Sequence, residues 1–463
     1  MENVLTARVA QFITETDWRR LPAPIHSVAK GLVYDHLSVT LAGSRSMAGR
    51  LIQEYVEGLK GLPEAPILGT DRRAPEALAS LANGVAAHAD DYDDTQVASL
   101  PDRVTGLLTH PTTPVLAAVL AVAATEGAPG RDMLIAYEVG LEVACKMAEA
   151  INPDHYKRGF HSTGTLGAFG AFAAAAKLLR LNEKEILLGI GIVASLASGL
   201  RGNFGTMTKP LHAGRAAENG IMAARLAQKG FTATPDVLDS RWGFFSILGG
   251  GVDRDYLLGH LGNPFQLESP GVSIKPYPCG SLAHPTMDAI RDLVKEQGFG
   301  PERVKQVDIG VTQHIRNALR YNRPQTALEA KFSLEFGVTM ILLTGKAGIH
   351  QYIDEIVMSS QVQRFLDRVH CSIDSQMDAL GSDKMHTAIR VHLEDGRSFE
   401  KEASIARGYP ERPFSMDDHL AKFKECAETV VDKDAGETVW RLLMNLEELP
   451  SVNEITKYLV PKT

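Results

Sequence analysis

Two neighbouring segments, at about 164–180 and 183–200, consist almost entirely of small and aliphatic residues. Folded as helices they have no polar face, and a helix that is apolar all round must be buried on all sides. Their glycine and alanine residues let neighbouring backbones approach closely. We therefore expect them to form the middle of a helical bundle, in which polar residues at helix ends can line a cavity.

Further helices are predicted on both sides of these two, because apolar residues recur there at helical spacing. Gly127 and Pro129 mark the end of one of them, and Asp132 lies favourably in the first turn of the next. At 463 residues the chain exceeds one average domain, and we expect residues 1–265 to form a large all-helical domain. The predicted helices are 5–14, 24–42, 49–59, 74–90, 113–127, 131–151 and about 212–229.

The composition changes after residue 265, where a crossover rich in proline, glycine and serine begins. A helix is predicted at 284–298, and the following VKQVDIGVTQHI alternates like a strand. Residues 386–403 carry an Asp-Gly turn between two arms, which predicts a hairpin. We expect 266–403 to form a smaller α+β domain and 404–463 to be helical and pack back on the first domain. The predicted fold class is mainly α.

Charge and cysteine usage exclude several classes of protein. A formal net charge of −8 argues against a nucleic-acid-binding protein, although a few local cations can still bind an anionic small molecule. The longest uncharged stretch, Ile186 to Leu200, is shorter than the roughly 18 residues of a membrane span, and the N-terminus lacks a secretion signal. The distant cysteines, with no CxxC pair, predict reduced thiols in the cytoplasm; they are Cys145, Cys279, Cys371 and Cys426.

Common catalytic motifs such as HExxH, GxSxG and GxxxxGK[ST] are absent, and the Gly-rich stretch 199–209 lacks nucleotide-binding spacing. Five polar clusters next to apolar helices remain. The first, HADDYDDTQ, begins at His88 and places four carboxylates within five positions. Such a group must be exposed, metal-bound or partly protonated. A solvated helix end and a carboxylate site for Mg²⁺ are both open interpretations.

The other four clusters carry histidines and lysines. His110 and His161 each precede a predicted helix, whose dipole would keep the imidazole neutral and able to accept a proton. Lys209 and His212 precede another helix in a turn suited to an anion, and Lys275, Cys279 and His284 lie at the domain crossover. Taken alone, each of these histidines is more often structural, and each of these lysines is more often exposed.

Taken together, these segments resemble the MmgE/PrpD family. Each string alone is weak, but they follow the family's order along nearly the whole chain, and the ordered set is highly specific. The strings are HADDYDDT (88–95), HPTTPVLAA (110–118), GFHSTGTLGAFGAFAAAA (159–176), KPLHAGRAAENG (209–220), KPYPCGSLAHP (275–285) and EAKFSLEF (329–336).

The resemblance implies a large helical domain and a smaller α+β lid domain, with the active site between them. It also implies a homodimer and no required metal or organic cofactor. Activities in the family include 2-methylcitrate dehydratase, cis-aconitate decarboxylase and iminodisuccinate epimerase. All three reactions move a proton at a carbon beside a carboxylate of a small polycarboxylic acid.

The family's site residues can be carried over onto matching positions of this chain. They fall on Asp91, Thr95, His110, His161, Lys209, Lys275 and Tyr321. We expect the two lysines to bind substrate carboxylates and the two histidines to act as general base and acid. Asp91 would orient a histidine or protonate a leaving hydroxyl, and Thr95 would hydrogen-bond the substrate. The remaining candidates for substrate contact are His212, Cys279 and His284.

Dehydration of a 2-methylcitrate-like acid is the first expectation, and epimerisation of a dicarboxylate such as iminodisuccinate is the second. Decarboxylation ranks lower, because the decarboxylases carry a histidine where this chain has Gly280. The long stretch between Thr95 and His110 also leaves the shape of the substrate open. A non-catalytic polycarboxylate-binding protein and a metal-dependent hydratase are the alternatives from other classes.

Overall fold

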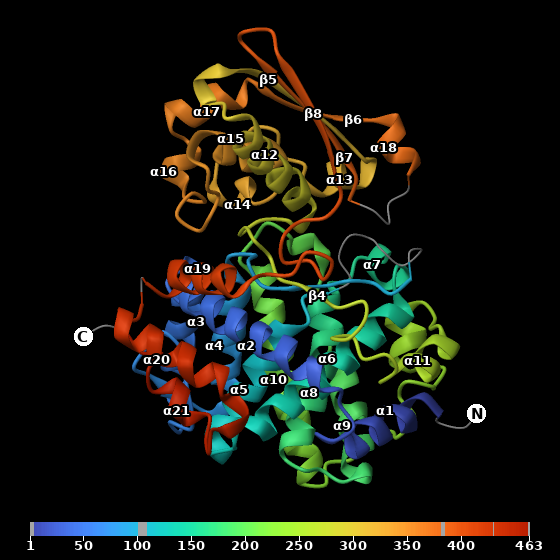
Figure 1. Ribbon diagram of the computed structural model, residues 1–463. Coiled ribbons are helices and arrows are strands. Elements are labelled where there is room, and N and C mark those ends of the chain that lie inside the picture. The colour runs from blue at the N-terminus through green and yellow to red at the C-terminus, as the bar shows by residue number, and fades with distance from the viewer. Residues whose placement is uncertain (1–3, 101–108, 381–384, 429, 462–463) are drawn as a thin grey trace. The chain divides into compact units, whose positions relative to one another are not determined.

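The computed structural model describes residues 4–100, 109–380, 385–428 and 430–461 (Figure 1). The chain divides into two compact units, which we call the helical unit and the mixed unit. The helical unit comprises Met1–Ser99, Leu108–Val272 and Met416–Thr463, and the mixed unit comprises Leu100–Leu107 and Ser273–Ser415. The domain boundaries predicted from the sequence, 265/266 and 403/404, lie earlier in the chain than those of the two units. The predicted mainly helical fold class is confirmed.

Helix α8 (Ser162–Leu178) lies in the core of the helical unit, and all of its residues from Ser162 to Ala176 are buried. It packs against α5 (Thr112–Glu126), α6 (Gly130–Ile151) and α10 (Thr208–Gln228). The prediction that this helix is buried on all sides is confirmed.

Helix α9 (Glu183–Leu196) departs from the same prediction. Leu187 and Leu188 are partly exposed and Ser195 is exposed, because the neighbours α1 (Val4–Glu15), α8 and α10 leave part of its surface uncovered. The helix also stops four residues early. Ala197 adopts an extended conformation (ψ 121°), and Gly199 has a φ of +143°, which carries the chain out of the helical path.

The remaining helices agree closely with the periodicity of the sequence. Gly127 ends α5 in the left-handed conformation, and Asp132 lies in the first turn of α6, both as predicted. The C-terminal helix α19 (Met416–Ala427) packs against α2 (Ala23–Gly43). The other elements of this unit are α3 (Met47–Gly58), α4 (Glu76–Ala89), α7 (Asp154–Lys157), α11 (Arg254–His260), α20 (Lys433–Met444), α21 (Asn453–Thr456), and the short strands β1 (Ala65–Pro66), β2 (Arg73–Ala74) and β3 (Thr95–Gln96).

The mixed unit contains a four-stranded sheet in the order β6-β5-β7-β8. Strand β5 (Val304–Val311) runs parallel to β6 (Val369–Ile373) and antiparallel to β7 (Thr387–Leu393), which pairs with β8 (Ser398–Ala403). The predicted hairpin is therefore confirmed. The predicted strand after residue 303 is shorter than expected, because Thr312 caps helix α13 (Gln313–Ala318) instead of continuing β5.

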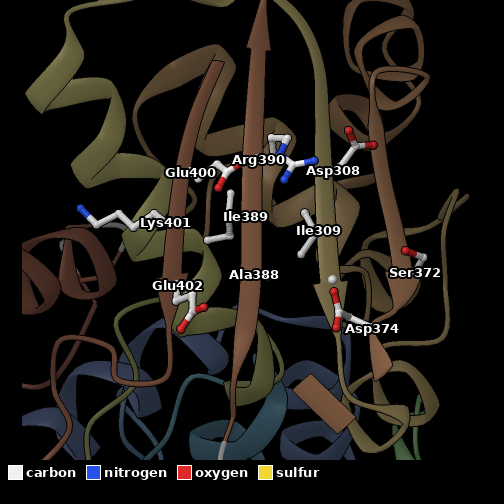
Figure 2. A pocket seen from close by; sticks show the side chains of 11 residues that line it. Asp308, Ile309, Ser372, Asp374, Ala388, Ile389, Arg390, Glu400, Lys401 and Glu402 are labelled. Atoms are coloured by element: carbon white, nitrogen blue, oxygen red, sulfur yellow. Dashed lines mark hydrogen bonds and ion pairs between the residues drawn. The ribbon is translucent and has the colours of Figure 1, made fainter. Parts of the chain in front are cut away.

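One face of this sheet is covered by helices and the other is open. Helix α12 (His284–Gln297) packs against β7 and β8, and α15 (Leu334–Thr344) packs against β6. Figure 2 shows the open face, where a groove is lined by charged side chains such as Asp308, Arg390 and Glu400. The last two form an ion pair at 2.6 Å, and no candidate site residue lines this groove.

The other helices of the mixed unit are short. They are α14 (Ala327–Ala330), α16 (Asp354–Val357), α17 (Ser360–Leu366) and α18 (Ser375–Ala379), and strand β4 (Val272–Ser273) lies at the boundary of the two units. Within the described ranges, no helix is both long and apolar enough to cross a membrane.

The crossing of α6 and α8 gives a testable consequence. A Cβ added at Gly170 would lie 2.8 Å from both the Ala144 Cβ and the Gly140 carbonyl oxygen, so the helices would have to separate. We predict that Gly170→Ala lowers stability by about 1–3 kcal/mol, measured as a fall in Tm. Gly259→Ala is the control, because an added Cβ there has no heavy atom within 4 Å. An unchanged Tm for G170A would contradict this account of the packing.

Candidate active site

The Asp93 carboxylate links the end of α4 to the start of α5. His88, in the last turn of α4, lies with its Nδ1 2.8 Å from Asp93 Oδ2. Thr113, in the first turn of α5, donates its hydroxyl to the same oxygen at 2.7 Å. Since a carboxylate accepts hydrogen bonds, His88 is held with its proton on Nδ1 and with Nε2 as the acceptor nitrogen.

His110 lies beside this link in the same orientation. Its Nδ1 is 2.8 Å from the Asp94 carbonyl oxygen, which can only accept, and 3.5 Å from Asp93 Oδ1. The imidazole therefore donates from Nδ1 and presents Nε2 as an acceptor. The rings of His110 and His88 are 4.6 Å apart. Both rings are thus fixed in the tautomer that a general base requires.

His161 completes a row of imidazoles. It directly precedes α8, its backbone amide donates to the Gly199 carbonyl at 3.0 Å, and only 3% of its surface is exposed. Its ring lies 5.8 Å from that of His88, and its Nδ1 lies 3.1 Å from His212 Nδ1. The edge of the Phe204 ring contacts it at a centroid distance of 4.9 Å. Four imidazoles from three helix ends and one helix interior are therefore neighbours.

Burial keeps His88, His161 and His212 neutral. It lowers the pKa of His161 well below the ordinary value, and the nearby His88 and Lys209 lower that pKa further. The pKa of His88 is lowered for the same first reason, although Asp93 opposes the shift, and the pKa of His212 falls to about 4. The sequence attributed a neutral His161 to the helix dipole; desolvation is the larger cause.

Lys209 and Asp91 form a buried ion pair, with Nζ 2.5 Å from Oδ1. Helix α10 begins at Thr208, so Lys209 and His212 lie within its first two turns. The expectation that they precede the helix was wrong, because the helix already begins at Thr208. Asp91 has a φ of +53°, a conformation that costs most residues about 1–2 kcal/mol and that aspartate tolerates better. This conformation directs the Asp91 carboxylate toward the Lys209 ammonium.

The carboxylate cluster is not a solvated helix end. Asp91, Asp93 and Asp94 are all buried, and each meets a different partner. Asp91 pairs with Lys209 and Asp93 with His88, whereas burial raises the pKa of Asp94 well above its usual value. The Asp94 carboxyl hydrogen-bonds the Thr112 hydroxyl, which lies 2.7 Å from the Tyr137 hydroxyl. Pairing of Asp91 and Asp93 and the raised pKa of Asp94 therefore accommodate these buried carboxylates.

Thr95 follows this cluster on β3 and is buried. The next residue, Gln96, donates its amide to the Thr109 carbonyl at 2.9 Å and its side chain to the Cys145 carbonyl at 3.0 Å. These bonds hold the two ends of the stretch between Thr95 and His110 together. Residues 101–108 of that stretch lie outside the described residues.

Three of these side chains form a donor set for a metal ion. His88, Asp91 and His110 each offer one ligand atom, and these atoms lie within 4.8 Å of one another. Two imidazoles and a carboxylate are common ligands of zinc and iron. The Lys209 ammonium already occupies the Asp91 carboxylate, so a cation would have to compete with it.

The remaining candidates belong to the mixed unit, where Cys279 and His284 are neighbours. His284 Nε2 lies 3.2 Å from the Cys279 carbonyl oxygen, and both residues are buried, as is Lys275. Tyr321 is partly exposed, and its hydroxyl accepts from Arg320 at 3.1 Å. The amides of Gly280 and Tyr321 donate to consecutive carbonyls, those of Lys331 and Phe332. The roles assigned to these candidates remain predictions.

Three members of the site were not among the sequence candidates. His88 and Asp93 were noted in their motif but given no role, although their spacing of five residues lets the carboxylate turn back onto the imidazole. Phe204 carried no signal, since an aromatic residue in a Gly-rich loop is common. Its ring lies 5.6 Å from Lys209 Nζ as well as beside His161.

Comparison with known proteins identifies the family. The MmgE/PrpD N-terminal domain matches residues 7–257, and the MmgE/PrpD C-terminal domain matches residues 277–448. The chain therefore belongs to the MmgE/PrpD family, as the ordered motifs predicted.

Curated relatives span nearly the whole chain. Cis-aconitate decarboxylase of Homo sapiens is 28% identical over 445 residues, covering 93% of this chain and 89% of the relative. The enzyme of the same name from Mus musculus is 28% identical, covering 93% and 88%. That of Aspergillus terreus is 24% identical, covering 98% and 96%. These proteins are similar to this chain along both of its family domains.

The buried Lys209–Asp91 pair gives a stability test. Removing one partner leaves a buried charge unpaired, and we predict that Lys209→Met and Asp91→Asn each cost about 3–5 kcal/mol, measured as a fall in Tm. The double variant should recover most of that loss. Lys457→Met is the control, because its pair with Glu454 has the same 2.5 Å separation but is exposed. Additive losses in the double variant would show that the pair is not coupled.

Proposed function

We propose that the chain is a lyase for a small polycarboxylic acid, in which His161 exchanges a proton with a substrate carbon beside a carboxylate. One observation carries the proposal: the neutral imidazoles of His88 and His161, with His110 beside them, adjoin the ammonium of Lys209. A cation near buried proton carriers is suited to an anionic substrate and to charge that develops on carbon.

Decarboxylation of a cis-aconitate-like tricarboxylate is the reaction that we propose first, because the similar proteins bear that name. The bond between carbon and the leaving carboxylate breaks, its electron pair remains on carbon, and carbon dioxide departs. A proton then forms the new carbon–hydrogen bond. The ammonium of Lys209 would stabilise the electron-rich species, and an imidazolium of His161 would donate the proton.

The low pKa of His161 is compatible with its role as proton donor once substrate is bound. Buried alone, His161 is neutral. Carboxylates of a bound substrate would raise the pKa of His161 through their negative charge, so the imidazole would take up a proton only when it is needed. The same substrate would compete for Lys209 with Asp91, and a transient release of Asp91 is part of the proposal.

Dehydration or epimerisation of a related acid is the second candidate, and Gly280 favours it. By resemblance the decarboxylases carry a histidine at this position. Here a Cβ would lie 2.9 Å from Leu319 Cδ2, so the Leu319 side chain would have to shift to admit a larger residue. Dehydration of a 2-methylcitrate-like acid, which the sequence favoured, and epimerisation of iminodisuccinate need the same proton transfer without loss of carbon dioxide.

The other inferred properties belong to the same proposal. We propose that Lys275 supplies a second cation for the substrate, that Tyr321, Thr95, Cys279 and His284 contribute to binding, and that His110 is the second acid or base. A homodimer in the cytoplasm that requires no metal or organic cofactor is also proposed. These assignments rest on the resemblance to the family.

A substrate screen tests the proposed function. Purified protein in D₂O is incubated with cis-aconitate, 2-methylcitrate or iminodisuccinate, and carbon dioxide release and NMR spectra are followed. We predict release of carbon dioxide from cis-aconitate, with one deuterium bound to carbon in the product. His161→Gln should lower kcat by about 10²–10⁴-fold, the usual contribution of one acid–base group.

His260→Gln is the matched control, because the ring of this half-buried histidine of α11 hydrogen-bonds the Tyr256 carbonyl of its own helix. It should turn over like the wild type. Water loss or inversion without carbon dioxide would select the second candidate. Binding of every acid without chemical change would make the chain a binding protein, and loss of activity in EDTA would establish metal dependence.

A further inference from the structure

His161 and His212 form an imidazole pair that leads from the interior toward solvent. Their Nδ1 atoms are 3.1 Å apart, so one ring donates and the other accepts. His161 is buried, whereas His212 is partly exposed. Thr206 and Met207, just before α10, are exposed as well. Solvent therefore reaches the end of the helix that carries His212.

Two glycines hold the pair in close packing. A Cβ at Gly199 would lie 3.3 Å from His212 Cγ and 3.5 Å from His161 Cβ, and Gly199 has a φ of +143° that larger residues rarely adopt. A Cβ at Gly164 would lie 3.1 Å from His212 Cβ. The backbone thus approaches both rings directly, and it fixes their relative position without any side chain between them.

The charges around the pair disfavour a resting imidazolium. His88, His110 and Lys209 act on His161, and His88 and Lys209 act on His212; all lower the affinity of these rings for a proton. Neither ring stores a proton in such surroundings. A proton placed on either one is therefore passed on readily, which is what a relay requires.

We infer that His212 relays protons between solvent and His161. The inference rests on the proposed function and deepens it, because a decarboxylation replaces a carboxylate by hydrogen and consumes one proton in each turnover. The buried His161 cannot draw that proton from bulk water directly. His212 is the partly exposed titratable neighbour hydrogen-bonded to it.

In the relay a proton moves from solvent through both rings to the substrate carbon. Water or buffer gives a proton to His212 Nε2, and the proton on His212 Nδ1 passes to His161 Nδ1. His161, now an imidazolium, gives the proton on Nε2 to the substrate carbon, whose electron pair forms the carbon–hydrogen bond. His161 is left neutral with its proton on Nδ1 and His212 with its proton on Nε2, and both rings return to their starting tautomers before the next turnover. The reverse sequence carries a proton from substrate to solvent when the reaction begins with its removal.

Two substitutions separate the relay from a structural role. His212→Asn keeps a polar atom near the Nδ1 position and can hydrogen-bond His161, but an amide does not pass a proton on. His212→Ala removes both functions and leaves room for a small molecule. His260→Gln again serves as the control. For each protein kcat and KM are measured against pH and buffer concentration, with and without added imidazole.

We expect H212N and H212A to lower kcat at least tenfold with little change in KM. Turnover of both should rise with buffer concentration, and imidazole should restore H212A, whereas the wild type and H260Q respond to neither. Wild-type kcat in H212N would overturn the relay, whether or not H212A is impaired. A tenfold loss that neither buffer nor imidazole relieves would overturn it too.

A second measurement decides the relay independently of turnover. With ¹⁵N-histidine labelling, the exchange rate of the His161 ring proton with water is compared in the wild type and in H212N. Slower exchange by tenfold or more in H212N supports the relay, and equal rates overturn it. If the wild type converts none of the three acids, the proposed function fails while this exchange rate still decides the role of His212.

Discussion

The site depends on one buried carboxylate, that of Asp93, which binds the end of one helix and the start of another. His88 and Thr113 meet on its Oδ2 atom, and His110 lies within 3.5 Å of Oδ1. The carboxylate thereby fixes the tautomer of the buried His88 ring, while the Asp94 carbonyl fixes that of the buried His110 ring. Without this carboxylate, the His88 ring would have no defined acceptor nitrogen.

This arrangement requires helices that approach one another closely. The small residues of α6, α8 and α10 bring their backbones together, as at Gly140 and Gly170, so that the polar ends of α4, α5 and α8 fall beside one another. The same burial then lowers the pKa of His88 and of His161 and raises that of Asp94. The close approach of the helices therefore determines both the packing of the unit and the protonation of these buried groups.

Much of this fold could be predicted from local patterns. The burial of α8 follows from its lack of a polar face, and the hairpin of β7 and β8 follows from its Asp-Gly turn. The exposed side of α9 could not be predicted, because it depends on which neighbours cover it. Strand β6 was missed as well, since its parallel pairing with β5 joins segments about 60 residues apart.

The candidate site, too, could be predicted only in part from the sequence. The order of the motifs identified His110, His161 and Lys209 as candidates. Within the helical unit these residues lie near His88. The state of the carboxylate cluster could not be predicted, because exposed, metal-bound and protonated aspartates have the same sequence. Their burial in the folded chain separates Asp91, Asp93 and Asp94 from exposed aspartates.

The central claim is that Asp93 fixes the imidazoles for proton transfer, and the most direct test is the kcat of Asp93→Asn on the acid that the wild type converts. Asparagine preserves the size of the side chain but not its charge. The account predicts a kcat lower by about 10²-fold or more, with Tm and KM changed little. A D93N variant that turns over like the wild type would contradict it.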